Sequence, residues 1–299
     1  MPKYFVCADA VFGATNIRQV TTANHSTNQE HRKGMNSGGA AVVQVSGKAG
    51  GEISQIVSGD LAALVALNSN AFCSAGLSLL SSTITIPYKI RAAGAVFVSG
   101  SNNVHLTGAN ALIVPTSFEA SQDGDFALAN MDVHWLSADG VTKGCDDATG
   151  QSIASQAFNA EYTLGPCYIN GTAIAGVQSF RVTPGIEVVK PPLGSGSVFP
   201  TFAGIKAAMP TMQLTVNDWD AIAGTVGDFT AMTSANFYMK KRADSGVFTA
   251  AATSEHIRFT FAAGLADTDS ISVSNNDDGS ATITLHGKVL TAAAAVALP

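Results

Sequence analysis

An internal repeat constrains this chain of 299 residues more than any other feature of its sequence. The segment Lys89–Phe97 recurs as Lys240–Phe248, 151 residues later, and the same spacing carries His105 onto His256. Two further blocks match in the same order along the chain: Ile17–Val20 with Val177–Phe180, and Met131–His134 with Ile283–His286. Because three collinear matches point to a duplication, we expect two copies of one structural unit.

The repeat predicts a division of the chain into domain A at 1–138, a linker at 139–161 and domain B at 162–299. A domain typically has about 100–200 residues, so the length agrees with two domains. The segment Asp139–Gly150 is rich in Gly, Asp and Thr and lacks hydrophobic periodicity, which is typical of a linker.

Each repeat is predicted to be mainly β. Short alternating runs such as Ser82–Ile86 and His256–Phe261 are typical of half-buried strands. One amphipathic helix is expected in each repeat, following Ser58 in domain A and Asn217 in domain B as N-caps. The residues proposed to anchor these helices, by their acidic first turns and apolar faces, are Asp60, Leu61 and Leu64, and Asp218, Trp219 and Ile222.

A long irregular segment follows the early strand of each repeat. Loops longer than about 12–15 residues are uncommon and are usually functional or disordered. We expect Thr21–Gly39 to be a polar loop that is largely disordered in the free subunit, because it has almost no apolar residues. In Thr183–Pro200, Ile186–Val189 suggests an extending hairpin. The candidate contact residues of these two segments are His25, Glu30, His31, Arg32 and Lys33, and Glu187, Lys190, Pro191 and Pro192.

The residues that carry chemistry form no catalytic pattern. The sequence has no HExxH, GxSxG, P-loop or GxGxxG motif, so we predict no enzyme activity, no metal site and no cofactor. His105, His134, His256 and His286 fall into two repeat-matched pairs, which favours a packing role. His25 and His31 lie among charged residues and fit either a solvated segment or polar contacts between subunits.

The charge of the chain argues against one class of partner, nucleic acid. The net charge is −6 and only 13% of residues are charged, with no basic stripe, so non-specific binding of nucleic acid is not expected. No signal peptide and no membrane span is expected. The cysteines should therefore be reduced in a cytoplasm, although Cys145 and Cys167 flank the linker and could pair after release into an oxidising medium.

The segment Tyr168–Val189 resembles the opening of tail-tube subunits of long-tailed bacteriophages, in which a short strand runs through a "V-N-G-x-x-I-x-G-V" turn into the sheet. Domain A departs from this pattern, with Cys7–Gly13 at the matching place. The resemblance implies two tandem tail-tube-like β-sandwich or barrel domains, each with one flanking helix and one long stacking loop.

The resemblance also implies a function. Tail-tube subunits close into rings that stack into a conduit for DNA, and a subunit with two fused domains would close as a trimer of pseudo-sixfold symmetry. The implied partners are further copies of the chain, other tail proteins at the tube ends, and DNA that passes without specific binding. The implied location is the virion tail, assembled in the host cytoplasm. The alternatives are a tail-tip, tail-completion or capsid-decoration subunit, and, from other classes, a host-binding adhesin or an enzyme.

Overall fold

A computed structural model describes residues 3–35, 41–67, 77–79, 83–92, 103–123, 126–153, 160–190, 197–218, 230–243, 245–274 and 277–299. The fold is mainly β, as predicted, and its strands pair antiparallel. The first half contributes β1 (Lys3–Cys7), β2 (Ala10–Phe12), β3 (Thr15–Ile17), β4 (Val20–Met35), β5 (Ala41–Ser58), α1 (Leu61–Leu67), β6 (Leu77–Leu79), β7 (Ile84–Ala92), β8 (Asn103–Gly108), β9 (Ala111–Ser121), β10 (Leu128–Trp135) and β11 (Asp146–Gln151).

The second half continues without a helix among its described residues. Its strands are β12 (Glu161–Ile169), β13 (Thr172–Ile174), β14 (Val177–Thr183), β15 (Ile186–Val189), β16 (Gly204–Ala208), β17 (Thr211–Val216), β18 (Thr230–Arg242), β19 (His256–Ser274) and β20 (Asp277–Val296).

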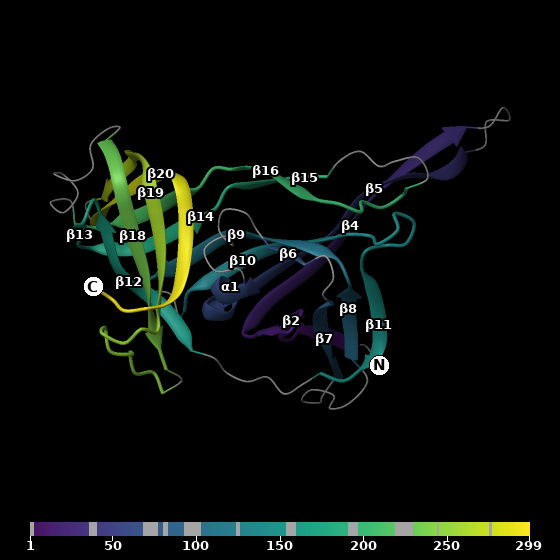
Figure 1. Cartoon of the computed structure of the whole chain (residues 1–299), viewed down its shortest axis with the longest axis horizontal. Coiled ribbons are helices and arrows are strands. Elements are labelled where there is room, and N and C mark those ends of the chain that lie inside the picture. The colour runs from purple at the N-terminus through teal and green to yellow at the C-terminus, as the bar shows by residue number, and fades with distance from the viewer. Residues whose placement is uncertain are drawn as a thin grey trace.

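One large sheet runs through both halves of the molecule (Figure 1). Its strand order is β13-β12-β18-β19-β20-β17-β14-β9-β10-β5-β4, and β6 pairs with β9 at the side. A second sheet, β11-β8-β7-β2-β3 with β1 on β7, belongs to the first half, and β15 and β16 form a separate pair. The segment predicted as a linker therefore contains the strand β11, which pairs with β8.

Two four-stranded units within the large sheet have the same strand order and the same register. In β4-β5-β10-β9, Gln55 pairs with Asp132, and in β14-β17-β20-β19 the corresponding pair is Gln213 with Thr284. The register of β9 on β10 shifts beside Asn130, and that of β19 on β20 shifts at the corresponding place, between Thr268 and Ser270. A residue of the first unit and the residue at the same place in the second unit are separated by a nearly constant number of positions along the chain. The separation is 157 residues between β4 and β14 and 158 between β5 and β17. It is 152 residues between β10 and β20 and 153 between β9 and β19.

Helix α1 begins two residues later than the pattern suggested. The Ser58 hydroxyl accepts a hydrogen bond from the Asp60 N–H at 3.0 Å, and the Asp60 carboxylate accepts one from the Arg18 N–H at 3.0 Å. Both side chains therefore hold the backbone in place just before the first turn of the helix. Leu61 and Leu64 are fully buried, as the apolar face predicted. In domain B, Asp218 is in coil, and Trp219 and Ile222 lie outside the described residues.

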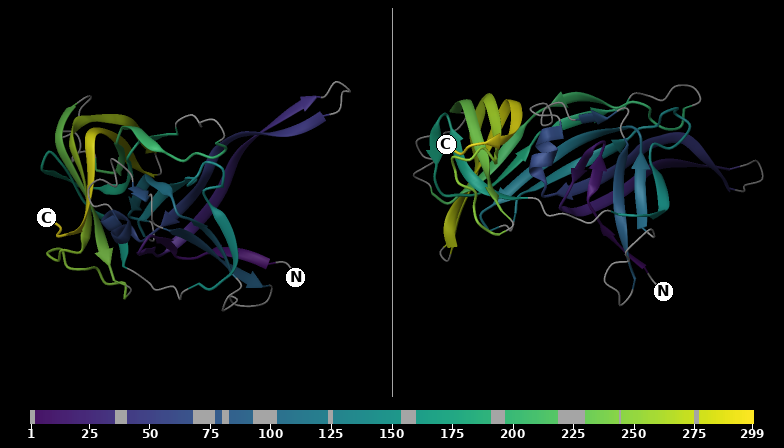
Figure 2. Two further views of the ribbon diagram at one scale, coloured as in Figure 1. Left: turned by 45° about the vertical axis from the view of Figure 1, so that its right-hand side comes forward. Right: turned by 60° about the horizontal axis from the view of Figure 1, so that its bottom comes forward.

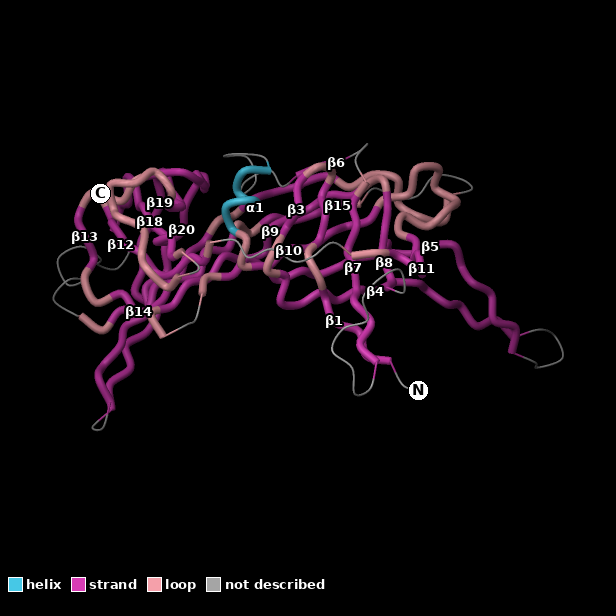
Figure 3. Tube along the Cα trace, turned by 90° about the horizontal axis from the view of Figure 1, so that it is seen from below, coloured by secondary structure: helices cyan, strands magenta, loops and turns pink. Residues whose placement is uncertain are grey.

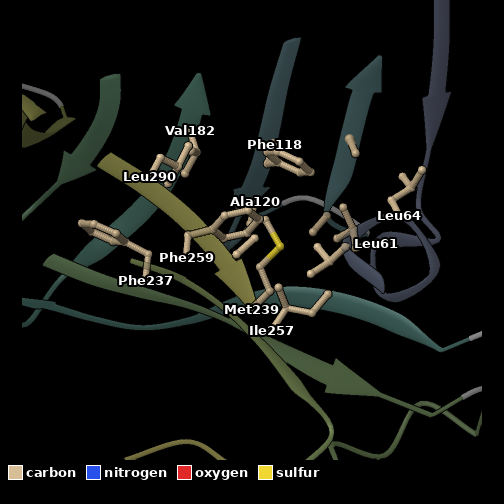
Figure 4. Close-up of a cluster of buried hydrophobic side chains, with 14 of the residues drawn as sticks. Leu61, Leu64, Phe118, Ala120, Val182, Phe237, Met239, Ile257, Phe259 and Leu290 are labelled. Carbon is tan, nitrogen blue, oxygen red and sulfur yellow. The ribbon is translucent and has the colours of Figure 1, made fainter. Parts of the chain in front are cut away.

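The buried core is continuous between the halves. Figure 4 shows Leu61 and Leu64 of the first half beside Ile257 and Met239 of the second. All four side chains are fully buried, and the rings of Phe118 and Phe259 pack across the same boundary with centroids 4.8 Å apart. Because the boundary is filled with apolar side chains, the two halves form one packed body.

The prediction that Thr21–Gly39 is an irregular loop is wrong for its described part, whereas its disorder in the free subunit stays a prediction. Residues Val20–Met35 form strand β4, which pairs with β5 as far as Met35 and Ala41. The alternation pattern missed this strand because the residues from Thr21 to Lys33 are nearly all polar and show no apolar period of two. The signal that could have found it lies in the partner, where the run Ala41–Val45 has strong β-propensity.

The second long segment begins as predicted. Strand β15 pairs with β16 and extends the β14–β17 hairpin, whereas Pro191 and Pro192 lie outside the described residues. We call the outer part of the β4–β5 hairpin, which projects beyond the body, the first arm, and we call β15–β16 the second arm. Figure 2 shows the first arm projecting beyond the body at one end of the molecule, while β19 and β20 lie at the opposite end.

Candidate assembly interface

The two four-stranded units meet edge to edge through main-chain pairing of β9 with β14. The register runs from Ser121 opposite Ser179 to Phe118 opposite Val182. Within this register, Arg181 lies opposite Glu119, and its Nε is 3.4 Å from the Glu119 carboxylate. Both side chains are exposed, so this ion pair adds little stability. The junction is therefore a backbone contact with an apolar core behind it.

The outer edges of the same two units have no strand partner among the described residues. Strand β4 ends the order of the sheet. On β19, pairing with β18 stops at Ala266, so the last part of the strand pairs only with β20. By the repeat register, Thr22 of β4 corresponds to Ser179, and Ser274 of β19 corresponds to Ser121. The two free edges thus reproduce the two edges that meet at the internal junction.

The face of this sheet turned away from the core is polar over the junction. Two grooves open on it, one centred on β9, β14 and β17 and the other on β4, β5 and β10. The hydroxyl, amide and charged side chains that line them are Thr22, Asn24, Gln55, Thr116, Ser117, Glu119, Ser121, Asn130, Asp132, Ser179, Arg181, Gln213, Thr215 and Thr282.

Charge on this face is sparse and largely satisfied locally. The Ser117 hydroxyl donates to Glu119 at 2.8 Å, and the Asn130 amide donates to Ser117 at 2.8 Å. Burial raises the pKa of Asp132 above its ordinary value, although a hydrogen bond from Gln55 acts in the opposite direction. Arg181 is the one cation among the residues that line these two grooves, so the face offers hydroxyl and amide groups without a basic track.

The second arm lies on the first half of its own chain. Leu112, Val114 and Leu136 form an apolar cluster with Ala203, which precedes β16 at the far end of the arm, and Ile186, Val188 and Ile205 of the arm pack against this cluster. Figure 3 shows β15 extending from the second half over the strands of the first. Leu112, in the middle of the covered area, is only 3% exposed.

Hydrogen bonds and a close approach hold the far end of this arm. The Ser137 N–H donates to the Pro200 carbonyl at 2.8 Å, and the Phe199 N–H donates to the Gly140 carbonyl at 3.0 Å. Gly51 has a φ of 85°, and a Cβ atom there would lie 2.6 Å from Lys190 Nζ and 2.9 Å from the Pro200 ring. The lack of a side chain at Gly51 is therefore what lets the second arm cross the base of the first.

This contact buries a histidine. His134 is the cross-strand partner of Leu112, and burial lowers its pKa to about 4, with Lys190 adding a smaller repulsion. Its Nδ1 atom has no hydrogen-bond partner within the described structure. His134 is thus held neutral. The packing role predicted for the paired histidines is also seen at His256, which is fully buried and accepts the Lys241 N–H at 3.0 Å.

A serine beside a histidine was missed by the sequence reading, but it does not form a nucleophile. His25 Nδ1 lies 2.9 Å from Ser54 Oγ, and the Trp135 indole N–H donates to the same oxygen at 2.8 Å. Ser54 is fully buried, and the nearby Glu52 accepts the Cys145 N–H at 2.9 Å. The cluster therefore fixes the base of the first arm and gives no access to a substrate.

The predicted contact residues that the structure describes lie on β4 and on or beside β15, and they are not brought together. Glu30, His31, Arg32 and Lys33 occupy consecutive positions on β4, with His31 opposite Val45. Glu187 on the second arm forms an ion pair with Lys206 at 2.8 Å, within its own hairpin. The apolar contacts around Leu112 were not found from the sequence, because alternation alone does not say which half-buried leucine has a partner.

The described part of the chain has neither a cluster of metal-binding side chains nor a long apolar helix. No group of three or more His, Cys, Asp or Glu side chains could hold a metal ion there. None of its helices is long and apolar enough to cross a membrane. Cys145 and Cys167 are separate buried thiols, so the suggested pairing does not occur in this structure. Burial raises the pKa of Cys145 to about 12 and raises that of Cys167 as well.

The chain was compared with known proteins through family models and curated sequences. Neither comparison found a match.

Proposed function

We propose that this protein is a virion structural subunit that assembles through its sheet edges into rings, and that the rings stack into the tail tube of a long-tailed bacteriophage. The observation that carries the proposal is the pairing of β9 with β14, which joins two units of the same register edge to edge. The proposal assigns the protein no catalytic role.

The pairing of β9 with β14 inside one chain indicates how the edges of two copies would pair. Strand β4 of one copy would pair with the free part of β19 in the next, with Thr22 opposite Ser274 and His25 opposite Ile271. Such a contact uses different surfaces on the two partners, so it either closes into a ring or continues as a filament. Closure would also cover the free edges of β4 and β19, and covering edges is a usual solution to the aggregation risk that they carry. Three copies would give six units around the ring.

The polar face supports a conduit. In a ring built by edge pairing, the grooved face around Glu119, Asp132 and Thr215 forms one continuous surface with those of its neighbours. If that surface is turned toward the lumen, DNA meets hydroxyl, amide and a few acidic groups rather than a basic track. Because affinity for DNA comes largely from neutralising phosphates with Lys and Arg, DNA would slide along such a wall without binding it.

A disulfide at the proposed edge tests this directly. Thr22→Cys combined with Ser274→Cys should give covalent oligomers on a non-reducing gel, and the products should end at the ring size. The matched control is Ser121→Cys with Ser179→Cys, because these residues face each other within one chain and should cross-link without a change in mass.

The outcomes separate the candidate functions. Oligomers that require both new cysteines support edge-paired assembly. If only the internal control cross-links, at every protein concentration tested, edge pairing between copies is wrong. A discrete role as a tail-tip, tail-completion or capsid-decoration subunit then becomes the better proposal.

A further inference from the structure

A leucine–histidine pair occurs twice in the fold, once covered and once bare. Leu112 pairs with His134 across β9 and β10, and Leu265 pairs with His286 across β19 and β20. The two pairs hold the same register position in the two units. Leu112 is 3% exposed and Leu265 is 46% exposed, and His286 is exposed where His134 is buried.

The difference in exposure between Leu112 and Leu265 arises from the second arm. The cover on Leu112 is the second arm, which continues from β14 and β17. The strands of the first half that match β14 and β17 are the beginning of β4 and the end of β5, and they continue as the first arm. The first arm projects from the end of the molecule opposite to β19 and β20, so it cannot reach Leu265 of its own chain (Figures 1 and 2).

We propose that the surface formed by Leu265, His286 and Val289 is the docking site for the first arm of a second copy of this chain. The internal contact provides the geometry: a hairpin leaves the sheet beside β9, crosses the outer face and covers the leucine. Repeating this step between copies places the first arm of one chain, beyond the edge-paired start of its β4, over β19–β20 of the next. Val289 adds a second apolar side chain to the surface, at 49% exposure.

This inference rests on the proposed edge-paired assembly and assigns the first arm a lateral role within a ring. It changes the expectation that the arms serve only to stack rings. Leu265 and Val289 are large exposed apolar side chains on paired strands: Leu265 lies opposite His286, and Val289 follows His286 by three residues on β20. In the described part of the chain, Leu265 is therefore the exposed counterpart of Leu112, and the hairpin that matches the second arm lies at the opposite end of the molecule.

The test measures hydrogen exchange in the distal part of the first arm, between Asn28 and Gly50. The protein is compared as a dilute reduced monomer and as the covalent assembly made with Thr22→Cys and Ser274→Cys. We expect amide exchange in the arm to slow at least tenfold on assembly. Adding Leu265→Asp should abolish most of that protection while the cross-link still forms. Val247→Asp is the matched control, because Val247 is 66% exposed and lies outside the proposed site.

Each outcome has one meaning. Loss of arm protection in the Leu265→Asp assembly but not in the Val247→Asp assembly supports the docking site. A cross-linked assembly in which Leu265→Asp leaves the arm protected, or in which the arm is never protected, overturns the docking site and leaves edge pairing standing. Failure to cross-link at all overturns both. Denaturant unfolding of each monomer shows whether the variants fold as the parent does.

Discussion

Leu112 and Leu265 hold the same register position in two matching strand pairs, yet one is 3% exposed and the other 46%. The second arm accounts for the difference, because it packs on Leu112 and nothing in the described chain packs in the same way on Leu265. The proposed docking of a second copy on Leu265 would give the two leucines the same kind of cover.

Detaching the second arm should expose Leu112 and its cross-strand partner His134 to solvent. Val188 faces the apolar cluster, whereas the adjacent Val189 is exposed. Val188→Asp places a carboxylate against Leu112, so we expect the arm to release and the pKa of His134 to rise from about 4 toward 6.5. NMR titration of the histidines measures this shift. Val189→Asp should leave the titration unchanged, and an unchanged pKa in both variants would argue against burial by the arm.

His134 should also make the fold sensitive to acid. Its folded pKa of about 4 lies below its ordinary value of 6.5, so the unfolded chain takes up the proton first as pH falls. The contribution to stability is therefore complete above pH 6.5 and is lost progressively toward pH 4, by roughly 3 kcal/mol in total. Urea unfolding across this range measures the slope. His134→Gln should flatten it, and an equal slope in that variant would assign the sensitivity to other groups.

The hydroxyl of Ser54 should be important for stability rather than for catalysis. Ser54→Ala leaves the buried Trp135 indole N–H without its acceptor, which typically costs about 1–3 kcal/mol. Ser26 is the matched control, since its exposed hydroxyl makes only a long contact of 3.4 Å with the Ile53 carbonyl. Denaturant unfolding should show a clear loss for Ser54→Ala and a change within about 0.5 kcal/mol for Ser26→Ala. Equal losses of stability in the two variants would contradict the stabilising role of the hydrogen bond between Ser54 and Trp135.

Helix α1 should couple the two halves. Leu64 is fully buried in the core that both halves share, so Leu64→Ala should cost about 2–5 kcal/mol. Unfolding followed by tryptophan fluorescence and by circular dichroism should still give one coincident transition, because the whole body loses stability together. Ala66→Ser, on the exposed side of the same helix, should change little. Two separated transitions in the parent protein would contradict a shared core.

The sequence predicted a β-rich chain and the buried face of α1, because hydrophobic periodicity reports directly on burial. It failed on β4, whose hairpin stands away from the body and whose polar residues such as Asn24 and Gln29 carry no apolar alternation. It also predicted a linker where β11 pairs with β8, since the polar run Asp146–Gln151 is an edge strand that needs little apolar content.

The candidate interface was less accessible to sequence reasoning. The match of His134 with His286 was found from the repeat, but only the structure shows that one is covered and the other bare. The pairing of β9 with β14 could not be foreseen either, because edge pairing uses main-chain groups that every residue carries.

Electron microscopy of the purified protein over a concentration series tests self-assembly most directly. The account predicts hollow filaments with a regular axial repeat, and end views with threefold or pseudo-sixfold symmetry. Monomers that remain discrete at the highest concentration, with no rings and no filaments, would contradict it.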